Sequence, residues 1–198
     1  MKRLSILIIC VLIAALILPT AVHADEEFLI GLIPEENIFR QVKRHKPMEA
    51  YLTKKLGMNV RFTILSRYPH IIKRFVSRNL DGAFFGIFTA VLAMEDLKVE
   101  PIARPVKLDG GTTARGVIFV RKDSGINSVQ DMKGRKAAFV DNVTATGYLY
   151  ALAYFKQNGV NNIESFLSEY YFTGSHDTTV YTVLAGRADI GSVKQRIL

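Results

Sequence analysis

Short apolar runs typical of strands alternate with helix-like stretches along most of this 198-residue chain, and this alternation restricts the fold more than any other feature. Strands are expected at residues 28–33, 60–65, 83–85, 99–106, 116–121, 136–140, 169–172 and 188–193. Helices are expected over residues 47–56, from Pro69, after Gly86, and over residues 128–134, 147–158 and 177–185. This order predicts α/β lobes with largely parallel sheets.

The first 24 residues have the pattern of a secretory signal peptide. Lys2 and Arg3 precede an apolar run over residues 6–18, and a small-residue cleavage site ends at Ala24. The run is short for a membrane span, which needs about 20 residues. We therefore expect residues 1–24 to be removed and the protein to be periplasmic or extracellular. An uncleaved membrane anchor is the alternative.

The cysteine content and the net charge limit the chemistry of the exported part. Cys10, the single cysteine, would leave with the signal peptide, so neither a disulfide nor a thiol nucleophile would remain. The formal charge of +8 stays positive without Lys2 and Arg3. A basic protein attracts nucleic acid, anionic membranes or small anions, and export argues against nucleic acid. The basic run over residues 43–46 is interpreted as a solvated face or loop.

A polar, glycine-containing stretch over residues 108–113 is the best candidate for a linker. It divides the chain into lobe 1 at residues 25–107, a linker at 108–114 and lobe 2 at 115–198. In open α/β sheets, ligands bind beyond the carboxyl ends of strands, where helices begin. Three such junctions carry hydroxyls or small residues.

The first junction follows the strand that ends at Val140. Thr144 and Thr146 flank Ala145 and precede Gly147 at the expected start of a helix. The first N–H groups of a helix have no intrahelical acceptor, and the helix dipole favours an anion there. Gly147 would let a ligand approach the backbone. An ordinary N-cap by one of the threonines is the alternative.

The second junction is Thr173-Gly174-Ser175-His176-Asp177. Ser175 is a candidate helix cap, and His176 could donate a hydrogen bond to an anion, more strongly when protonated. Asp177 would repel an anion unless it accepted a hydrogen bond from a protonated ligand oxygen or a ligand amine. A lone histidine without a second ligand at suitable spacing argues against a metal site.

Two further residues are candidates in lobe 1. The third junction is Phe85-Gly86-Ile87-Phe88-Thr89, with Thr89 in the position of a helix cap. Tyr68 precedes Pro69 at another helix start, where its phenol could donate to an oxyanion while its ring closes a cleft. A packing role as a hydrophobic staple is the alternative for Tyr68. No catalytic motif, metal-ligand spacing or cofactor-binding motif is visible, so neither catalytic residues nor a cofactor are expected.

An ordered set of motifs resembles the phosphate, phosphite and phosphonate-binding proteins of ABC importers. The resemblance runs from about Phe28 to the chain end and rests on Tyr68, Asp81-Gly82-Ala83-Phe84-Phe85-Gly86, Val120 to Ile126, Asp131 to Gly134, Thr144 to Tyr148, Gly174 to Asp177 and Gly186 to Gly191.

The resemblance implies a two-lobed type II periplasmic-binding fold that closes over its ligand and presents it to an ABC permease, as a monomer. It implies that Thr144, Ala145, Thr146 and Gly147 bind the oxyanion, together with Tyr68, Thr89, His176 and Asp177. Relatives continue with elements that return to lobe 1, and this return is missing before Leu198.

The segment after Asp189 lacks the acidic and amide residues expected of aminoalkylphosphonate receptors, which favours a simpler oxyanion. Three other functions are alternatives to a transport receptor. They are a sensory input domain of a membrane-bound signalling protein, a non-functional shortened paralogue, and an enzyme of the same fold. The enzyme has the least support, because the sequence offers neither a nucleophile nor an acid–base pair for it.

Overall fold

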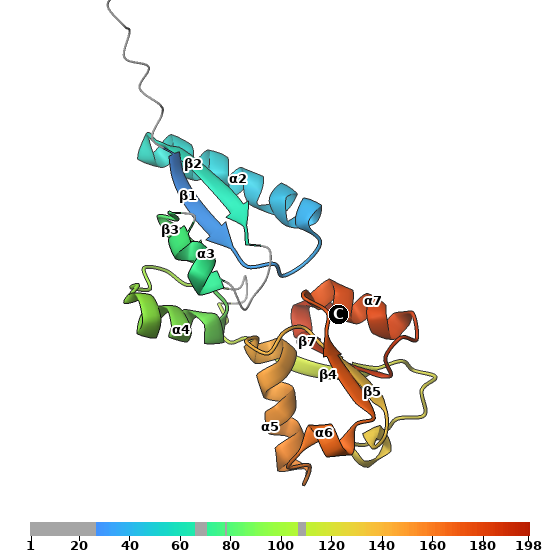
Figure 1. The fold of residues 1–198 in the computed structure, drawn as a ribbon. Helices are drawn as coiled ribbons and strands as arrows, with labels where there is room; N and C mark the ends of the chain where they lie inside the picture. The colour runs from blue at the N-terminus through green and yellow to red at the C-terminus, as the bar shows by residue number, and fades with distance from the viewer. Residues whose placement is uncertain (1–26, 66–70, 78, 107–109) are drawn as a thin grey trace, which may run out of the picture.

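The structure is a computed structural model that describes residues 27–65, 71–77, 79–106 and 110–198. These residues form two α/β units, each built around its own sheet (Figure 1). We name residues 27–106 lobe 1 and residues 110–198 lobe 2. The predicted α/β class with mostly parallel sheets is confirmed. The predicted boundaries at the linker stay a prediction, since residues 107–109 are outside the described part, as is the whole of the expected signal peptide.

Lobe 1 contains a three-stranded parallel sheet in the order β2-β1-β3. Phe28 in the central strand lies opposite Val60, and Gly31 lies opposite Ala83. The elements are β1 (Glu27–Leu32), α2 (Ile38–Leu56), β2 (Asn59–Ile64), α3 (Ile71–Ser77), β3 (Gly82–Phe84) and α4 (Ile87–Leu97).

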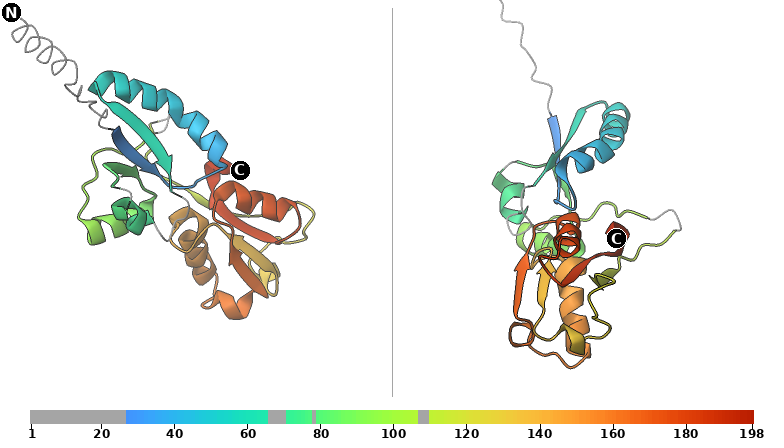
Figure 2. Two further views of the ribbon diagram at one scale, coloured as in Figure 1. Left: turned by 45° about the horizontal axis from the view of Figure 1, so that its top comes forward. Right: turned by 90° about the vertical axis from the view of Figure 1, so that its right-hand side faces the viewer.

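Lobe 2 contains a four-stranded sheet in the order β4-β7-β5-β6, in which only the β4–β7 pair is antiparallel. Gly116 lies opposite Lys194, so the chain enters and leaves this sheet at the same end (Figure 2). The elements are β4 (Gly116–Val120), η2 (Gln130–Met132), β5 (Lys136–Phe139), η3 (Ala145–Leu149), α5 (Tyr150–Gln157), α6 (Ile163–Phe166), β6 (Glu169–Phe172), α7 (His176–Leu184), β7 (Ile190–Lys194) and η4 (Gln195–Ile197).

Helix α2 begins nine residues before the predicted start at Pro47, and the prediction of a helix start there was wrong. The Asn37 side chain accepts hydrogen bonds from the N–H groups of Phe39 and Arg40 and so forms the N-cap. Pro47 therefore lies inside the helix. The basic run over residues 43–46 belongs to this helix, where Arg44 pairs with Glu36 at 2.6 Å and Lys46 pairs with Glu49 at 2.7 Å.

The strand predicted at residues 99–106 does not form in the part of this segment that the structure describes. Pro101 and Pro105 cannot donate the hydrogen bonds that a sheet ladder needs. Ile102 is 98% exposed, so the apolar residues that suggested a strand have no sheet to pack on.

The predicted 147–158 helix is also modified at its start, because residues 145–149 form one turn of π-helix before α5 begins. π-turns are uncommon and occur frequently at functional sites. The other predicted strands are confirmed within about two residues.

Candidate functional site

The carboxyl ends of the parallel strands in both lobes face the same inter-lobe region. Ile33 and Leu65 follow the ends of β1 and β2, and they share one apolar cluster with Val140 after β5 and Val193 in β7. Because helices begin just beyond these strand ends, the predicted junctions of the two lobes are brought towards each other. The candidate site therefore lies beyond the carboxyl ends of the strands, where α/β folds usually bind their ligands.

The Thr144–Gly147 segment leaves the end of β5 and is almost fully buried. Thr144 is 5% exposed and Thr146 is 6% exposed. The Thr144 hydroxyl donates to the carbonyl of Asp141 at 2.6 Å, and its side chain makes no capping hydrogen bond. The alternative of an ordinary Thr144 cap is therefore wrong. Since the hydroxyl proton of Thr144 is engaged, Thr146 and the N–H groups of the first turn are the donors left for an anion.

Gly147 is required by packing as well as by any ligand. A Cβ atom at this position would lie 2.5 Å from Cγ2 and 2.6 Å from Cβ of Val140, distances that side chains do not tolerate. The Gly147 carbonyl also accepts a hydrogen bond from the N–H of Val140 at 3.3 Å. The glycine thus holds the π-turn tightly against the end of β5, and Ala145 is buried in the same turn.

The second junction lies directly beside the first. The N–H groups of Thr173 and Gly174 donate to the carbonyls of Phe139 and Val140, both at 2.9 Å. The Ser175 hydroxyl accepts from the N–H of Thr178 at 3.4 Å and caps α7, as predicted. The start of α7 is thereby fixed next to the start of the π-turn.

His176 is 3% exposed, and its surroundings disfavour the protonated form in which it would donate more strongly. Burial lowers the pKa of its imidazole to about 4, and the attraction of Glu35 does not offset this. Its Nδ1 accepts the N–H of Lys194 at 3.1 Å, which places the ring proton on Nε2. The ring is therefore neutral near pH 7 and offers one N–H donor.

The Asp177 carboxylate is occupied by donors of the protein. Oδ2 accepts the N–H of Asn37 at 2.7 Å and Nη2 of Arg40 at 3.0 Å. Oδ1 accepts the hydroxyl of Ser175 at 2.6 Å and the N–H of Thr178 at 2.9 Å. The predicted repulsion between Asp177 and an anion is thus countered by groups from lobe 1.

The two lobe 1 candidates have different outcomes. Thr89 is buried in the first turn of α4, where its hydroxyl donates to the Gly86 carbonyl at 3.1 Å. The prediction of Thr89 as the helix cap was wrong, because Gly86 occupies the N-cap position. Gly86 faces the side chain of Ile33, which places this helix start beside the inter-lobe cluster. Tyr68 lies outside the described residues.

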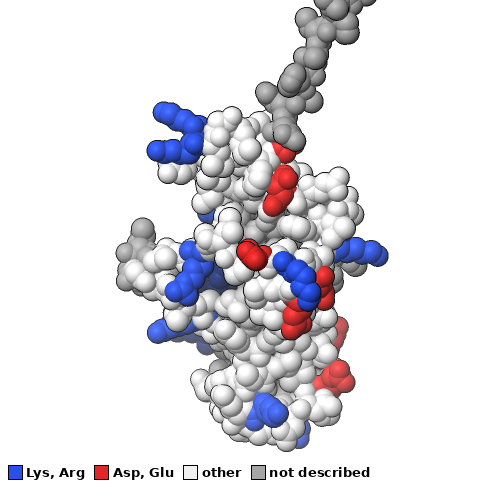
Figure 3. Space-filling view, turned by 90° about the vertical axis from the view of Figure 1, so that its left-hand side faces the viewer, with Lys and Arg blue, Asp and Glu red and all other residues white. Residues whose placement is uncertain are grey.

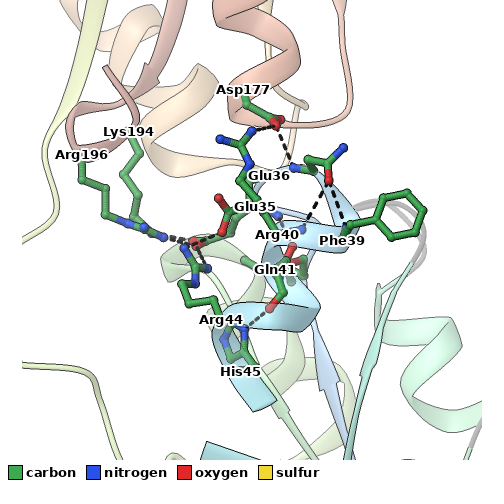
Figure 4. A network of polar contacts seen from close by, with 12 residues as sticks. Glu35, Glu36, Phe39, Arg40, Gln41, Arg44, His45, Asp177, Lys194 and Arg196 are labelled. Atoms are coloured by element: carbon green, nitrogen blue, oxygen red, sulfur yellow. Dashed lines mark hydrogen bonds and ion pairs between the residues drawn. The ribbon is translucent and has the colours of Figure 1, made fainter. Parts of the chain in front are cut away.

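Sequence reasoning missed Glu35, which lies next to Pro34 just beyond β1. Its carboxylate contacts Lys194, Arg196 and Arg44, which come from both lobes (Figure 4). Its position after a strand end was the available signal, but the resemblance contained no motif there. The two nearer basic partners, Lys194 and Arg196, are about 160 residues away in the sequence.

The surface beside this network is hollowed rather than deeply pocketed. A hollow of about 260 Å³ is lined by Glu36, Arg40, Asp177, Val180, Tyr181, Arg196 and Ile197. Asp177 is the one predicted site residue among them. On the face drawn in Figure 3, Lys and Arg side chains stand in small separate groups with Asp and Glu between them. Among the described residues, no group of three or more His, Cys, Asp or Glu side chains could hold a metal ion. No helix in this part of the chain is long and apolar enough to cross a membrane.

The chain is similar in sequence to proteins of known name. It is 30% identical over 182 residues to the phosphate-import protein PhnD of Mycolicibacterium smegmatis and 26% identical over 175 residues to a probable phosphite-binding protein PhnD1 of Prochlorococcus marinus. These alignments cover 87% and 85% of this chain but 56% and 58% of the relatives. The chain thus spans a little more than half of their length.

The fold is similar to that of solved binding proteins. The structure of Prochlorococcus marinus PhnD1 in complex with methylphosphonate superposes with a TM-score of 0.76 at 24% identity, over 87% of this chain and 65% of that one. The model of the family described as "ABC transporter, phosphonate, periplasmic substrate-binding protein" matches residues 30–198. The chain therefore belongs to the family of periplasmic substrate-binding proteins of phosphonate ABC transporters.

Proposed function

We propose that this chain is the extracytoplasmic solute-binding component of an ABC importer and binds a small phosphorus oxyanion between its lobes. Phosphate, phosphite and phosphonates are the candidate ligands, because its relatives include proteins named for phosphate import and phosphite binding and one solved in complex with methylphosphonate. In this proposal, binding is reversible and no chemical reaction follows it. The partner is an ABC permease rather than nucleic acid. The protein acts as a monomer, and residues 1–24 are the signal peptide for its export.

One observation carries this proposal. The π-turn after β5, with Thr144, Ala145, Thr146 and Gly147, lies beside the start of α7 with His176, at the inter-lobe ends of the strands. N–H groups at a helix start, one hydroxyl and a neutral imidazole N–H are all hydrogen-bond donors. A site dominated by donors suits an anion whose oxygens are deprotonated.

Calorimetric titration of the folded chain with phosphate, phosphite, methylphosphonate and 2-aminoethylphosphonate tests the proposal. We expect binding of at least one of the first three, and weaker binding of the aminoalkyl compound, since the Asp177 carboxylate is already occupied. Absence of heat and of a thermal shift with all four, in a folded sample, would refute the proposal.

A double substitution tests the position of the site. Thr144→Ala combined with Thr146→Ala should lower the affinity about tenfold or more, because the Thr146 hydroxyl is a donor to the anion and one hydrogen bond to a charged group contributes about 1.5–3 kcal/mol, while the Thr144 hydroxyl holds the turn through the Asp141 carbonyl. The matched control is Thr112→Ala with Thr113→Ala, since both of these threonines are exposed. Equal affinity in the two double variants would remove the π-turn from the site.

A further inference from the structure

Beside the candidate site, each lobe has an acidic side chain that contacts the other lobe (Figure 4). Glu35, from the loop between β1 and α2 in lobe 1, meets cations at the end of lobe 2. Asp177, from the start of α7 in lobe 2, meets donors at the start of α2 in lobe 1. Each lobe therefore contributes a carboxylate that accepts hydrogen bonds from donors of the other lobe.

The Glu35 carboxylate contacts cationic side chains of both lobes. Lys194 Nζ lies 2.6 Å from its Oε1, and Arg196 contacts its Oε2, whereas Arg44 of its own lobe is farther away at 3.7 Å. Burial by itself would raise the pKa of Glu35, but the charges of Lys194 and Arg196 outweigh it and lower the pKa below its usual value. Glu35 is thus held ionised by the residues that end lobe 2.

The Asp177 contact is the mirror of this arrangement. Its Oδ2 accepts from the backbone N–H of Asn37, the N-cap of α2, as well as from Arg40 one turn further along. A carboxylate at the amino end of a helix is also favoured by the helix dipole. Asp177 therefore binds lobe 1 through both a backbone group and a side chain.

His176 lies between the two contacts and is held by both lobes. Its backbone N–H donates to the carbonyl of Glu35 at 3.1 Å, and its Nδ1 accepts from the N–H of Lys194 at 3.1 Å. Lys194 in turn donates from Nζ to the Glu35 carboxylate at 2.6 Å. Three segments thus form a closed triangle of hydrogen bonds around the imidazole.

We propose that Glu35 and Asp177 form a reciprocal inter-lobe clamp that docks lobe 1 on lobe 2 and positions His176 as an Nε2–H donor to the bound anion. In this arrangement Asp177 is a positioning residue and does not contact the ligand. The docking of the lobes stands on the contacts alone, whereas the role towards the anion rests on the proposed function.

The docking is tested by amide hydrogen exchange measured by NMR. The N–H groups of Asn37 and His176 donate across the lobes, so their exchange rates report directly on docking. We expect Glu35→Gln and Asp177→Asn to raise these two rates about tenfold or more, a change of about 1.4 kcal/mol or more in the docking free energy. The amide of Ala185, bonded within lobe 2 to the Tyr181 carbonyl, should keep its rate.

Glu169→Gln is the matched control for these substitutions, because the Lys136–Glu169 pair at 2.9 Å joins two strands of the same lobe. It should leave the exchange of the Asn37 and His176 amides unchanged. Should Glu35→Gln fail to fold, Asp177→Asn and Arg40→Gln break the second contact alone and decide the question. Unchanged exchange at both amides in the folded clamp variants would overturn the proposal.

The role of Asp177 is tested by a double-mutant cycle with Arg40, read as affinity for the oxyanion that binds the unmodified chain. A clamp acts through the fraction of docked molecules, so Asp177→Asn and Arg40→Gln should each lower affinity about fivefold or more, and together by less than the product. A full additional loss from Asp177→Asn in the Arg40→Gln background would assign Asp177 to the ligand and refute its positioning role. If no oxyanion binds, the proposed function fails, and amide exchange alone still decides the docking.

Discussion

The two lobes differ sharply in how they are stabilised. Among the described residues, sixteen buried hydrophobic residues lie in lobe 2 and six in lobe 1, although the two ranges are similar in length. Lobe 2 has a cluster of its own around Phe139 and Phe155, both completely buried. Three of the six in lobe 1, Ile33, Leu65 and Leu80, belong to the cluster shared with lobe 2.

This difference shows that lobe 1 depends on lobe 2 for much of its burial. Helix α2 of lobe 1 leaves Phe39 81% exposed, and α4 exposes Ile87 and Val91. Since burial of apolar surface is the main favourable contribution to folding, the free energy of unfolding should be concentrated in lobe 2 and in the inter-lobe cluster. The clamp then stabilises the lobe that has less core.

The largest effect is expected from a core phenylalanine in lobe 2. Phe155→Ala should lower the free energy of unfolding by about 3–5 kcal/mol, because it removes a fully buried ring and leaves a cavity. Phe39→Ala in lobe 1 should change it by no more than about 0.5 kcal/mol. Urea unfolding followed by circular dichroism measures both. Similar losses in the two variants would contradict the contrast between the lobes.

The second largest effect is expected from acid, which should lower the free energy of unfolding through the inter-lobe residue His176. The folded protein keeps His176 neutral down to about pH 4, whereas the imidazole of the unfolded chain binds a proton below about pH 6.5. Stability is therefore complete above pH 6.5 and falls as the pH is lowered to 4, by roughly 3 kcal/mol in total. Below this range, the lowered pKa of Glu35 extends the loss in the same direction.

His176→Asn isolates this contribution, because asparagine retains an acceptor but does not titrate. Its free energy of unfolding, measured by urea titration at a series of pH values, should fall less steeply between pH 6.5 and 4 than that of the unmodified chain. An equally steep fall in the variant would show that the acid sensitivity comes from other groups.

A pair of glycines compares the packing of the two lobes directly. Gly147→Ala should destabilise by about 1–3 kcal/mol, because the new Cβ collides with the branch point of Val140 rather than with a flexible side-chain end. Gly82 in β3 of lobe 1 has no neighbour within 4 Å of its would-be Cβ. Gly82→Ala should therefore be neutral or slightly stabilising. Thermal unfolding that ranks Gly82→Ala as the more harmful change would contradict this packing difference.

Much of the fold was predictable from local patterns, because the strands are short apolar runs bounded by glycine, proline or polar residues. The failures have specific causes. Residues 99–106 carry strand-type side chains, but two prolines and the lack of a neighbouring strand leave them irregular. Pro47 suggested a helix start, but the cap at Asn37 starts the helix earlier. The missing proline donors outweighed the strand pattern in the first case, and the side-chain cap at Asn37 outweighed the proline signal in the second.

The candidate site was predictable only as far as its junctions. Thr144, Thr146 and His176 lie where strand ends predicted them, whereas the state of each group depends on residues distant in sequence. The neutral form of His176 follows from its burial and from the N–H of Lys194, and the occupancy of Asp177 follows from Asn37 and Arg40. Glu35 was missed for the same reason, because Lys194 and Arg196, its two nearest cationic partners, lie about 160 residues away.

The smallest effect is expected from an ion pair on the outer surface of lobe 1. Arg61 Nε lies 3.2 Å from Glu27 Oε1 across β1 and β2, and the Arg61 side chain is well exposed. Glu27→Gln should lower the free energy of unfolding by at most about 1 kcal/mol, because exposed pairs are screened and lose side-chain entropy on forming. Glu169→Gln, in the corresponding surface pair of lobe 2, should shift the urea midpoint as little. A markedly larger effect of Glu27→Gln would mean that surface charge, rather than the shared apolar cluster and the clamp, compensates for the small core of lobe 1.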